Sequence, residues 1–129
     1  MTTMTATLMQ TDLPLPGRRQ GKVRDIYEAT TTAGADALLI VASDRISAFD
    51  VVMPNGIPGK GAMLTQLSAF WFDLIERHFG DRLTHHLIST DPADIAGLGG
   101  DEVAALRGRV TIGRRCRVIP VECVARGYI

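Results

Sequence analysis

One apolar stripe in the middle of the sequence restricts the possible fold more than any other feature. Its members recur with the spacing of one helical face and are Met63, Leu64, Leu67, Phe70, Trp71, Leu74 and Ile75. This spacing predicts one amphipathic helix, with Gly80 as its C-terminal stop. If the stripe is buried at ~1.5–3 kcal/mol for each side chain, the helix packs against a sheet as a main core element. The same spacing favours core positions over a stacking platform for the aromatic run at 70–72.

Segments with the pattern of β-strands lie on both sides of this helix. Residues 19–28 and 37–42 predict a hairpin whose second strand is buried on both faces, and the apolar positions of 109–125 predict further strands. Gly and Pro residues interrupt 87–106, which therefore predicts only one or two short helical turns. Because helices and strands alternate only loosely, the expected fold class is α+β, a largely antiparallel sheet with a packed helix.

Length and charge exclude several classes of protein. A chain of 129 residues can hold one domain with its own core. Fourteen basic and fourteen acidic residues cancel, so no overall charge attracts nucleic acid or a membrane, and no apolar run reaches the ~20 residues of a membrane span. Residues 1–10 lack the parts of a signal peptide, so we expect a cytoplasmic protein with Cys116 and Cys123 reduced. Residues 1–12 predict a flexible terminus before a lobe over 13–129.

The basic residues are unevenly divided between arginine and lysine. Twelve are arginine, and the two lysines, Lys22 and Lys60, each follow a glycine. Lysine in so arginine-rich a chain indicates positions that need a compact ammonium group, although chance and turn chemistry also explain the pair. Lys22 lies among Arg18, Arg19 and Arg24, where a glycine turn and cations favour phosphate oxygens. A solvated basic turn explains the same residues equally well.

Two further segments carry polar groups beside breaks in the pattern. Ser43–Asp50 follows a predicted strand and combines two carboxylates, two hydroxyls and a guanidinium. Such a set can bind a charged, polyhydroxylated ligand or a magnesium ion, and an Asx-turn with local salt bridges is the other interpretation. Gly59–Gly61 precedes the helix, where Lys60 and the first free N–H groups can meet an anion or simply form a turn that starts the helix.

The remaining polar residues near the C-terminus give weaker signals. Glu122 stands in an apolar run and needs a partner if it is buried, which Arg126 on the same strand face can supply. The three histidines do not form a ligand set, because adjacent His85 and His86 point to opposite sides of a strand.

Several blocks, taken together and in order, carry a family resemblance. They are Gly21–Tyr27, Ser43–Asp50, Gly56–Gly61, Leu64–Ser68, Phe70–Phe72 and Val118–Arg126. Each block alone is weak, but jointly they are specific, and they resemble the N-terminal half of the SAICAR synthetase (phosphoribosylaminoimidazole-succinocarboxamide synthase) family. The resemblance implies a nucleotide-binding lobe similar to the small lobe of protein kinases, an antiparallel sheet with a helix.

The resemblance also implies an ATP-dependent ligase of de novo purine synthesis. In that family ATP phosphorylates the carboxylate of carboxyaminoimidazole ribotide, and the amine of L-aspartate displaces the phosphate to give SAICAR, ADP and phosphate. The implied ATP-binding residues are Gly21, Lys22, Val23 and Arg24 at the phosphates and Val121, Glu122 and Cys123 near the adenine. The residues implied at the ribotide are Asp44, Arg45, Ser47, Asp50, Lys60 and Arg126.

The sequence departs from the family pattern after Arg126. The family signature continues with three variable residues, a small residue, Gly and Ser, whereas only Gly127–Ile129 follow here. The later acidic signature associated with nucleotide and magnesium is absent, and family members are about twice as long. We therefore expect an N-terminal fragment, inactive alone, whose Mg²⁺ ligands lie in the missing part. It should expose an apolar edge through which homo-oligomers can form.

Two other interpretations of the residues stay open. A small non-catalytic module could use Arg18–Arg24 to bind an anion, a nucleotide or nucleic acid, although zero net charge and 5% aromatic residues argue against nucleic acid. A folding unit with a purely structural role, built on strands at 37–41 and 118–125, accounts for the apolar pattern alone. RNA affinity with a steep salt dependence and no effect of ATP would favour the module.

Overall fold

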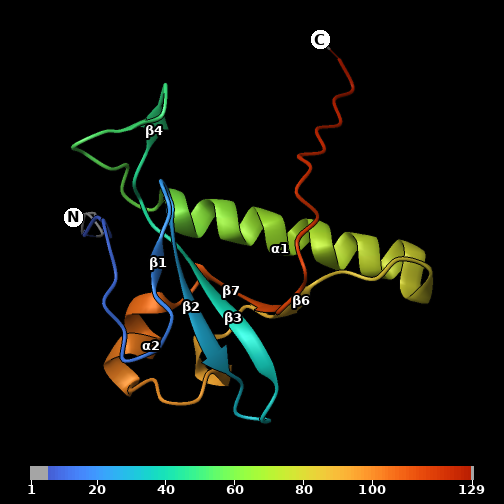
Figure 1. Cartoon of the computed structure of the whole chain (residues 1–129), viewed down its shortest axis with the longest axis horizontal. Helices are drawn as coiled ribbons and strands as arrows, with labels where there is room; N and C mark the ends of the chain where they lie inside the picture. The colour runs from blue at the N-terminus through green and yellow to red at the C-terminus, as the bar shows by residue number, and fades with distance from the viewer. Residues whose placement is uncertain (1–5, 129) are drawn as a thin grey trace, which may run out of the picture.

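An antiparallel sheet of five strands forms the centre of the structure, a computed structural model that describes residues 6–128 (Figure 1). The strands in spatial order are β1 (Arg19–Gln20), β2 (Arg24–Thr30), β3 (Asp36–Ala42), β7 (Val110–Arg114) and β6 (Leu87–Ser89). The predicted hairpin is confirmed, because β2 and β3 pair with Tyr27 opposite Leu39. A separate hairpin projects from the body and consists of β4 (Ser47–Ala48) and β5 (Val51–Val52).

The predicted long helix is confirmed as α1 (Lys60–Phe79), and it ends at Gly80, whose N–H donates to the Glu76 carbonyl. A short 3₁₀ turn, η1 (Gly80–Arg82), follows it. The segment 87–106 contains the expected helical turns, η2 (Pro92–Asp94) and α2 (Gly100–Leu106), and also supplies the unexpected strand β6. These elements confirm the α+β fold class. Within residues 6–128, no helix has the length and apolar character needed to cross a membrane.

The core lies on one face of the sheet. Alternate strand residues are buried there and pack against Ile95 and against Leu106 of α2. The buried apolar cluster consists of Tyr27, Ala29, Ala37, Leu39, Val41, Ile95, Leu106, Val110 and Ile112. Successive strand residues point to opposite faces, so the second face carries the intervening residues, which are only half-buried in β3. The prediction that 37–42 is buried on both faces therefore holds for one face only.

Helix α1 lies on the second face of the sheet, but most of its apolar stripe is exposed, and Leu64 is the stripe residue that lines the space beneath the helix. Only Gly61 and Thr65 of the helix are buried, whereas Leu67 and Trp71 each keep 53% of their surface exposed. The residues one turn apart at 61, 65, 68 and 72 face the sheet, and most of them are small. The prediction that the stripe, with Phe70 and Trp71, forms a main part of the core is therefore wrong. Periodicity located one face of the helix, but another face meets the sheet.

Residues 115–128 leave the sheet as a tail without regular secondary structure, and Figure 1 shows it extending away from the body. The predicted strand over 118–125 is therefore wrong. An extended apolar segment becomes a strand only when a neighbour accepts its hydrogen-bond ladder, and no strand within 6–128 pairs with it. Val118, for example, is 84% exposed, so the expected exposed apolar surface is present at this end of the chain.

The N-terminal segment before β1 packs against the sheet. Thr11 is buried, and its N–H and hydroxyl both donate to Asp25 Oδ2, at 2.7 and 2.8 Å. Leu8 N–H donates to Asp44 Oδ2 at 2.9 Å. Residues 8–11 therefore differ from the flexible terminus expected over 1–12, because the buried carboxylates of Asp25 and Asp44 accept hydrogen bonds from their backbone. Residues 1–5 of that expectation lie outside the described part of the chain.

Candidate functional site

The turn between β1 and β2 presents the first group of predicted ligand contacts. Gly21 N–H donates to the Arg24 carbonyl at 2.7 Å, which closes a tight turn around Lys22 and Val23. The Lys22 side chain is exposed and forms an ion pair with Asp50. Two blocks that lie 28 residues apart in the sequence therefore meet at this turn.

Arg45 lies beneath the turn and is only 3% exposed. Its Nη2 donates to the Gly21 carbonyl at 3.0 Å and to Asp25 Oδ1 at 2.7 Å, and its Nε donates to the Lys22 carbonyl at 3.1 Å. Its Nη1 donates to the Met9 carbonyl. The guanidinium is thus occupied by protein groups and supports the turn from within, while the ribotide contact that the family resemblance implies for Arg45 stays a prediction.

Asp25 is the anionic partner of Arg45 and has no exposed surface. Burial of the carboxyl tends to raise its pKa, but hydrogen bonds from Arg45 and Thr11, together with the Arg45 charge, hold that pKa below its ordinary value of 3.8. Asp25 was not among the functional residues predicted from the sequence. A signal was present, because Asp25 lies two residues before Tyr27 and four before Ala29 and so shares their buried strand face.

Asp44 forms a second buried anchor, at the start of α1. Its Oδ1 accepts from Gly61 N–H at 2.9 Å and from Arg109 Nη1 at 3.2 Å, and its Oδ2 accepts from Leu8 N–H. Burial tends to raise the pKa of Asp44, and these hydrogen bonds and the Arg109 charge lower it below 3.8. Like Arg45, Asp44 is internally bonded, so both residues shape the site from within. Arg109 was not selected from the sequence.

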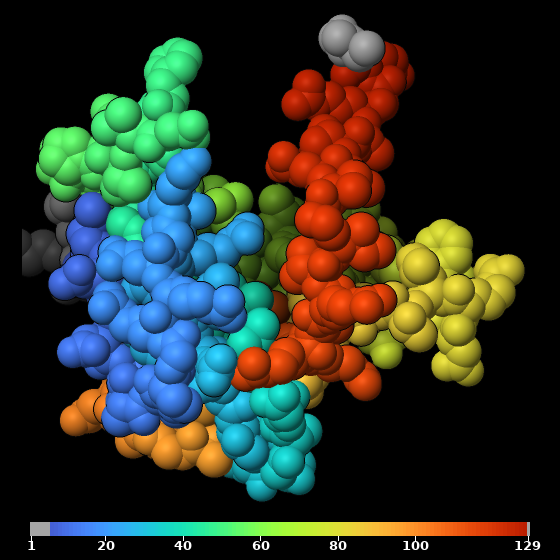
Figure 2. Space-filling model, in the orientation of Figure 1, coloured from blue at the N-terminus to red at the C-terminus, as the bar shows by residue number. Residues whose placement is uncertain are grey.

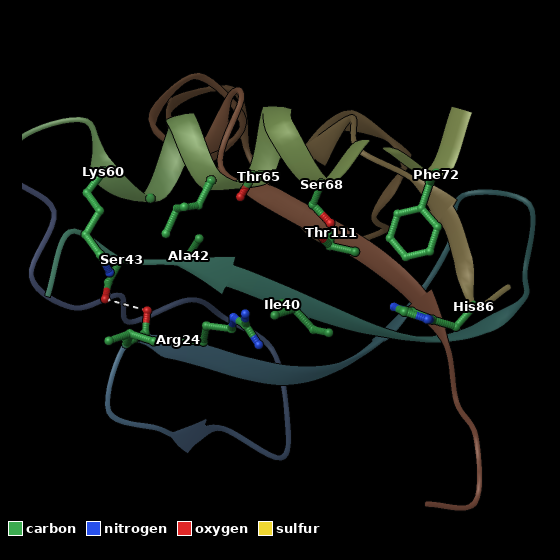
Figure 3. Close-up of a pocket in the computed structure, with 13 residues that line it drawn as sticks. Arg24, Ile40, Ala42, Ser43, Lys60, Thr65, Ser68, Phe72, His86 and Thr111 are labelled. Atoms are coloured by element: carbon green, nitrogen blue, oxygen red, sulfur yellow. Dashed lines mark hydrogen bonds between the residues drawn. The ribbon is translucent and has the colours of Figure 1, made fainter. Parts of the chain in front are cut away.

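A cavity of about 240 Å³ separates α1 from the second face of the sheet (Figure 3). Arg24, Ser43 and Lys60 lie at one end of it, and Phe72 and His86 lie at the other. The remaining lining residues are Val23, Ile40, Ala42, Gly61, Leu64, Thr65, Ser68 and Thr111. Lys60 Nζ donates to the Arg45 carbonyl at 2.9 Å, which ties the start of α1 to the loop that supports the turn. An apolar floor with cations at one end suits a ligand that has a flat ring and an anionic part.

Ser47 and Asp50 lie on the projecting hairpin of β4 and β5. Both are exposed, and Phe49 at its tip is fully exposed with a left-handed φ of 48°, followed by Asp50 at 64°. Such angles match a tight two-residue hairpin turn, in which a bulky residue is strained. In Figure 2 this green hairpin and the red tail are two separate projections from the body.

The predicted residues on the tail are not brought to the turn. Val121, Glu122, Cys123 and Arg126 are exposed, and no hydrogen bond or ion pair within residues 6–128 links them to Lys22 or to the cavity. The two cysteines of the tail are exposed and not bonded to each other. The described part of the chain contains no group of three or more His, Cys, Asp or Glu side chains placed to hold a metal ion.

Comparison with known proteins identifies the family. The family model described as SAICAR synthetase matches residues 18–129. The chain belongs to the SAICAR synthetase family. The match includes the turn, the anchors Asp25, Asp44 and Arg45, the cavity and the tail, but not the N-terminal segment that bonds these anchors.

Relatives of this SAICAR synthetase chain are similar over nearly its whole length. A phosphoribosylaminoimidazole-succinocarboxamide synthase of Rhodopirellula baltica is 46% identical in an alignment 138 positions long, which covers 95% of this chain and 41% of that protein. The synthase of the same name from Geobacter sulfurreducens is also 46% identical, over 98% of this chain and 40% of that protein. The chain thus spans about two fifths of the length of the curated relatives it matches.

Solved structures share the fold. The SAICAR synthase of Saccharomyces cerevisiae, in a complex with SAICAR, superposes with a TM-score of 0.63 at 38% identity. The superposition covers 92% of this chain and 38% of the yeast chain. The antiparallel sheet with its helix is therefore similar to the corresponding part of SAICAR synthase structures.

Proposed function

We propose that this chain supplies the nucleotide-binding part of an ATP-dependent ligase that joins L-aspartate to carboxyaminoimidazole ribotide. In this reaction the ribotide carboxylate attacks the γ-phosphorus of ATP, giving an acyl phosphate and ADP. The aspartate amine then attacks the acyl carbon, loses a proton and releases phosphate, giving SAICAR. Family membership and the names of the relatives support the proposal, while the chain spans two fifths of their length.

The observation that carries the proposal is the meeting of three separate family blocks at one end of the cavity. Lys22 of the turn contacts Asp50, and Lys60 contacts the backbone of Arg45, while Arg24 and Lys60 both line the cavity. Three cations beside a glycine turn can neutralise the charge of a triphosphate. Gly21, Lys22, Val23 and Arg24 are therefore proposed to bind the ATP phosphates.

The remaining assignments follow from exposure. Ser47, Asp50 and Lys60 are proposed to bind the ribotide, because Asp50 pairs with Lys22 of the turn, Ser47 is exposed on the same hairpin as Asp50, and Lys60 lines the cavity. Asp44 and Arg45 would act on the ribotide only through the loop that they support. Val121, Glu122 and Cys123 are proposed to meet the adenine and Arg126 the ribotide, which requires the tail to lie closer to the turn than it does here. Mg²⁺ would be bound by the part of the relatives that this chain does not span.

We infer that the isolated chain binds nucleotide but has no ligase activity, because of what the transition state requires. Stabilising an acyl phosphate requires donors and magnesium on both sides of the reacting groups, and the described residues offer one side only. We expect ATP binding without ligase turnover by the 129-residue chain. Robust turnover with ATP, Mg²⁺, aspartate and ribotide would contradict the inactivity.

Calorimetric titration with ATP tests the nucleotide site. Lys22→Ala should weaken binding at least about tenfold, because one charge-assisted contact contributes ~1.5–3 kcal/mol. Arg77→Ala is the matched control, since Arg77 is an exposed cation on α1 that pairs with Asp73 and lies outside the cavity lining. No ATP binding by the wild-type chain, or equal loss in both variants, would refute the site. Binding of single-stranded RNA with a steep salt dependence, and none of ATP, would instead favour a non-catalytic module.

A further inference from the structure

We infer that Arg45 is a positioning residue that turns the backbone N–H groups of Lys22 and Val23 toward solvent, where they form an anion site for phosphate. This inference rests on the proposed nucleotide function and adds a structural cause to it. The carbonyls of Gly21 and Lys22 both accept from the Arg45 guanidinium, at 3.0 and 3.1 Å. No other residue within 6–128 donates to these two carbonyls.

Peptide geometry converts these two bonds into an orientation of the N–H groups. In a trans peptide the C=O and N–H point in opposite directions, and no cis peptide occurs in the described chain. The Gly21 carbonyl belongs to the same peptide as the Lys22 N–H, and the Lys22 carbonyl belongs to the same peptide as the Val23 N–H. A buried guanidinium that draws both carbonyls inward therefore turns both N–H groups outward.

The N–H groups of Lys22 and Val23 are the ones that remain without a hydrogen-bond partner among the described residues, whereas Gly21 N–H is bonded to Arg24. Two successive free N–H groups form the concave backbone site that binds anions in many phosphate-binding loops. Lys22 supplies an ammonium group on the same residue, and its present partner Asp50 is exposed and can release it.

Arg45 is itself fixed firmly enough to hold the turn. Its Asp25 partner is fully buried and also accepts from Thr11, so the guanidinium cannot rotate away without leaving a buried carboxylate uncompensated. The planar fork of arginine donates to several acceptors in a fixed geometry, which a lysine ammonium cannot reproduce. The same residue type at position 109 pairs with Asp44 and with the Ala42 carbonyl but does not touch the turn.

Arg45→Lys and Arg109→Lys in the 129-residue chain form a matched test, since each keeps one buried charge and loses a guanidinium. Amide NMR spectra are recorded with and without ATP, and separately with inorganic triphosphate. We expect both ligands to shift the Lys22 and Val23 amides of the wild type. Arg45→Lys should weaken both affinities about tenfold, which corresponds to ~1.4 kcal/mol, while Arg109→Lys changes them less than about twofold.

Hydrogen exchange of the Gly21 amide, relative to the Leu39 amide of β3, reports the turn independently of ligand. It should accelerate in Arg45→Lys and stay unchanged in Arg109→Lys, because only the first loosens the turn. Unchanged Gly21 exchange in Arg45→Lys, or equal loss of affinity in both variants, would overturn the inference. Binding of triphosphate without ATP would support the anion site and refute the nucleotide function. If neither ATP nor triphosphate shifts the Lys22 and Val23 amide signals, the inference is overturned as well.

Discussion

Gly61→Ala offers the sharpest test of how α1 is held on the sheet. Gly61 is buried near the start of the helix, and its N–H is bound by Asp44. A Cβ atom at this position would lie 2.2 Å from the Ala42 carbonyl oxygen, and 2.7 Å from both the Ala42 carbonyl carbon and the Ser43 carbonyl oxygen. All three are backbone atoms of the chain leaving β3, so no side-chain rotation can relieve the contact.

The expected effect on stability is the difference between two opposing contributions. Replacing glycine by alanine within a helix normally stabilises it by ~1 kcal/mol. Overpacking a rigid site costs ~1–3 kcal/mol, and contacts this short with backbone place Gly61→Ala at the upper end of that range. We therefore expect a net loss of ~2 kcal/mol in the free energy of unfolding, which lowers the thermal midpoint by ~5–10 °C for a domain of this size.

The assay is thermal and urea unfolding followed by circular dichroism at the helical minimum. Gly100→Ala is the control, because Gly100 begins α2 and a Cβ there meets no atom within 4 Å. The control should be as stable as the wild type or slightly more stable. If Gly61→Ala is also at least as stable as the wild type, α1 does not approach β3 as closely as described, and the cavity beneath the helix would have a different shape.

Two further predictions concern charge and exposed apolar surface. The pKa of Asp25 is lower in the folded protein than its ordinary value of 3.8. Its contribution to the free energy of unfolding is therefore complete above pH 3.8 and is lost as the pH falls through the folded-state pKa. Urea midpoints measured from neutral to acidic pH should decline less in Asp25→Asn than in the wild type. Leu67→Ala, on the exposed stripe, should change the free energy of unfolding by less than ~0.5 kcal/mol, whereas Leu39→Ala in the core should lower it by ~2–5 kcal/mol. Equal losses of the two variants in urea unfolding would contradict the described orientation of α1.

The elements whose formation depends on nearby residues could be predicted from the sequence. The hairpin of β2 and β3 follows from apolar spacing and the end of α1 from Gly80, and both were predicted, whereas α1 begins at Lys60, inside the turn that was expected to precede it. The direction of the apolar stripe was not, because periodicity shows that a helix has an apolar face without showing which surface covers it. Trp71 illustrates this limit, since it belongs to the stripe yet remains half exposed.

Polar clusters are harder to interpret from spacing alone. Asp44 and Arg45 lie beside Ser47 and Asp50 in one short block, and the family resemblance implied the same role, contact with the ribotide, for all four. In the structure the first two are buried and internally bonded, while the last two are exposed on the projecting hairpin. The difference depends on Asp25 and Arg109, which lie 20 and 65 residues away from their partners in the chain. No local pattern contains that information.

Successive side chains of β3 belong alternately to the buried core and to the cavity under α1. Leu39 and Val41 belong to the buried cluster, whereas Ile40 and Ala42 line the cavity under α1. The same division applies across the turn, where Asp25 faces inward to Arg45 while Arg24 lines the cavity. Because neighbours along the strand point to opposite faces, the core face can keep its packing while the cavity face varies with the ligand. Arg45 is the exception that couples the two, since it is buried beside Asp25 and also bonds the Gly21 and Lys22 carbonyls of the turn that we propose to bind phosphate.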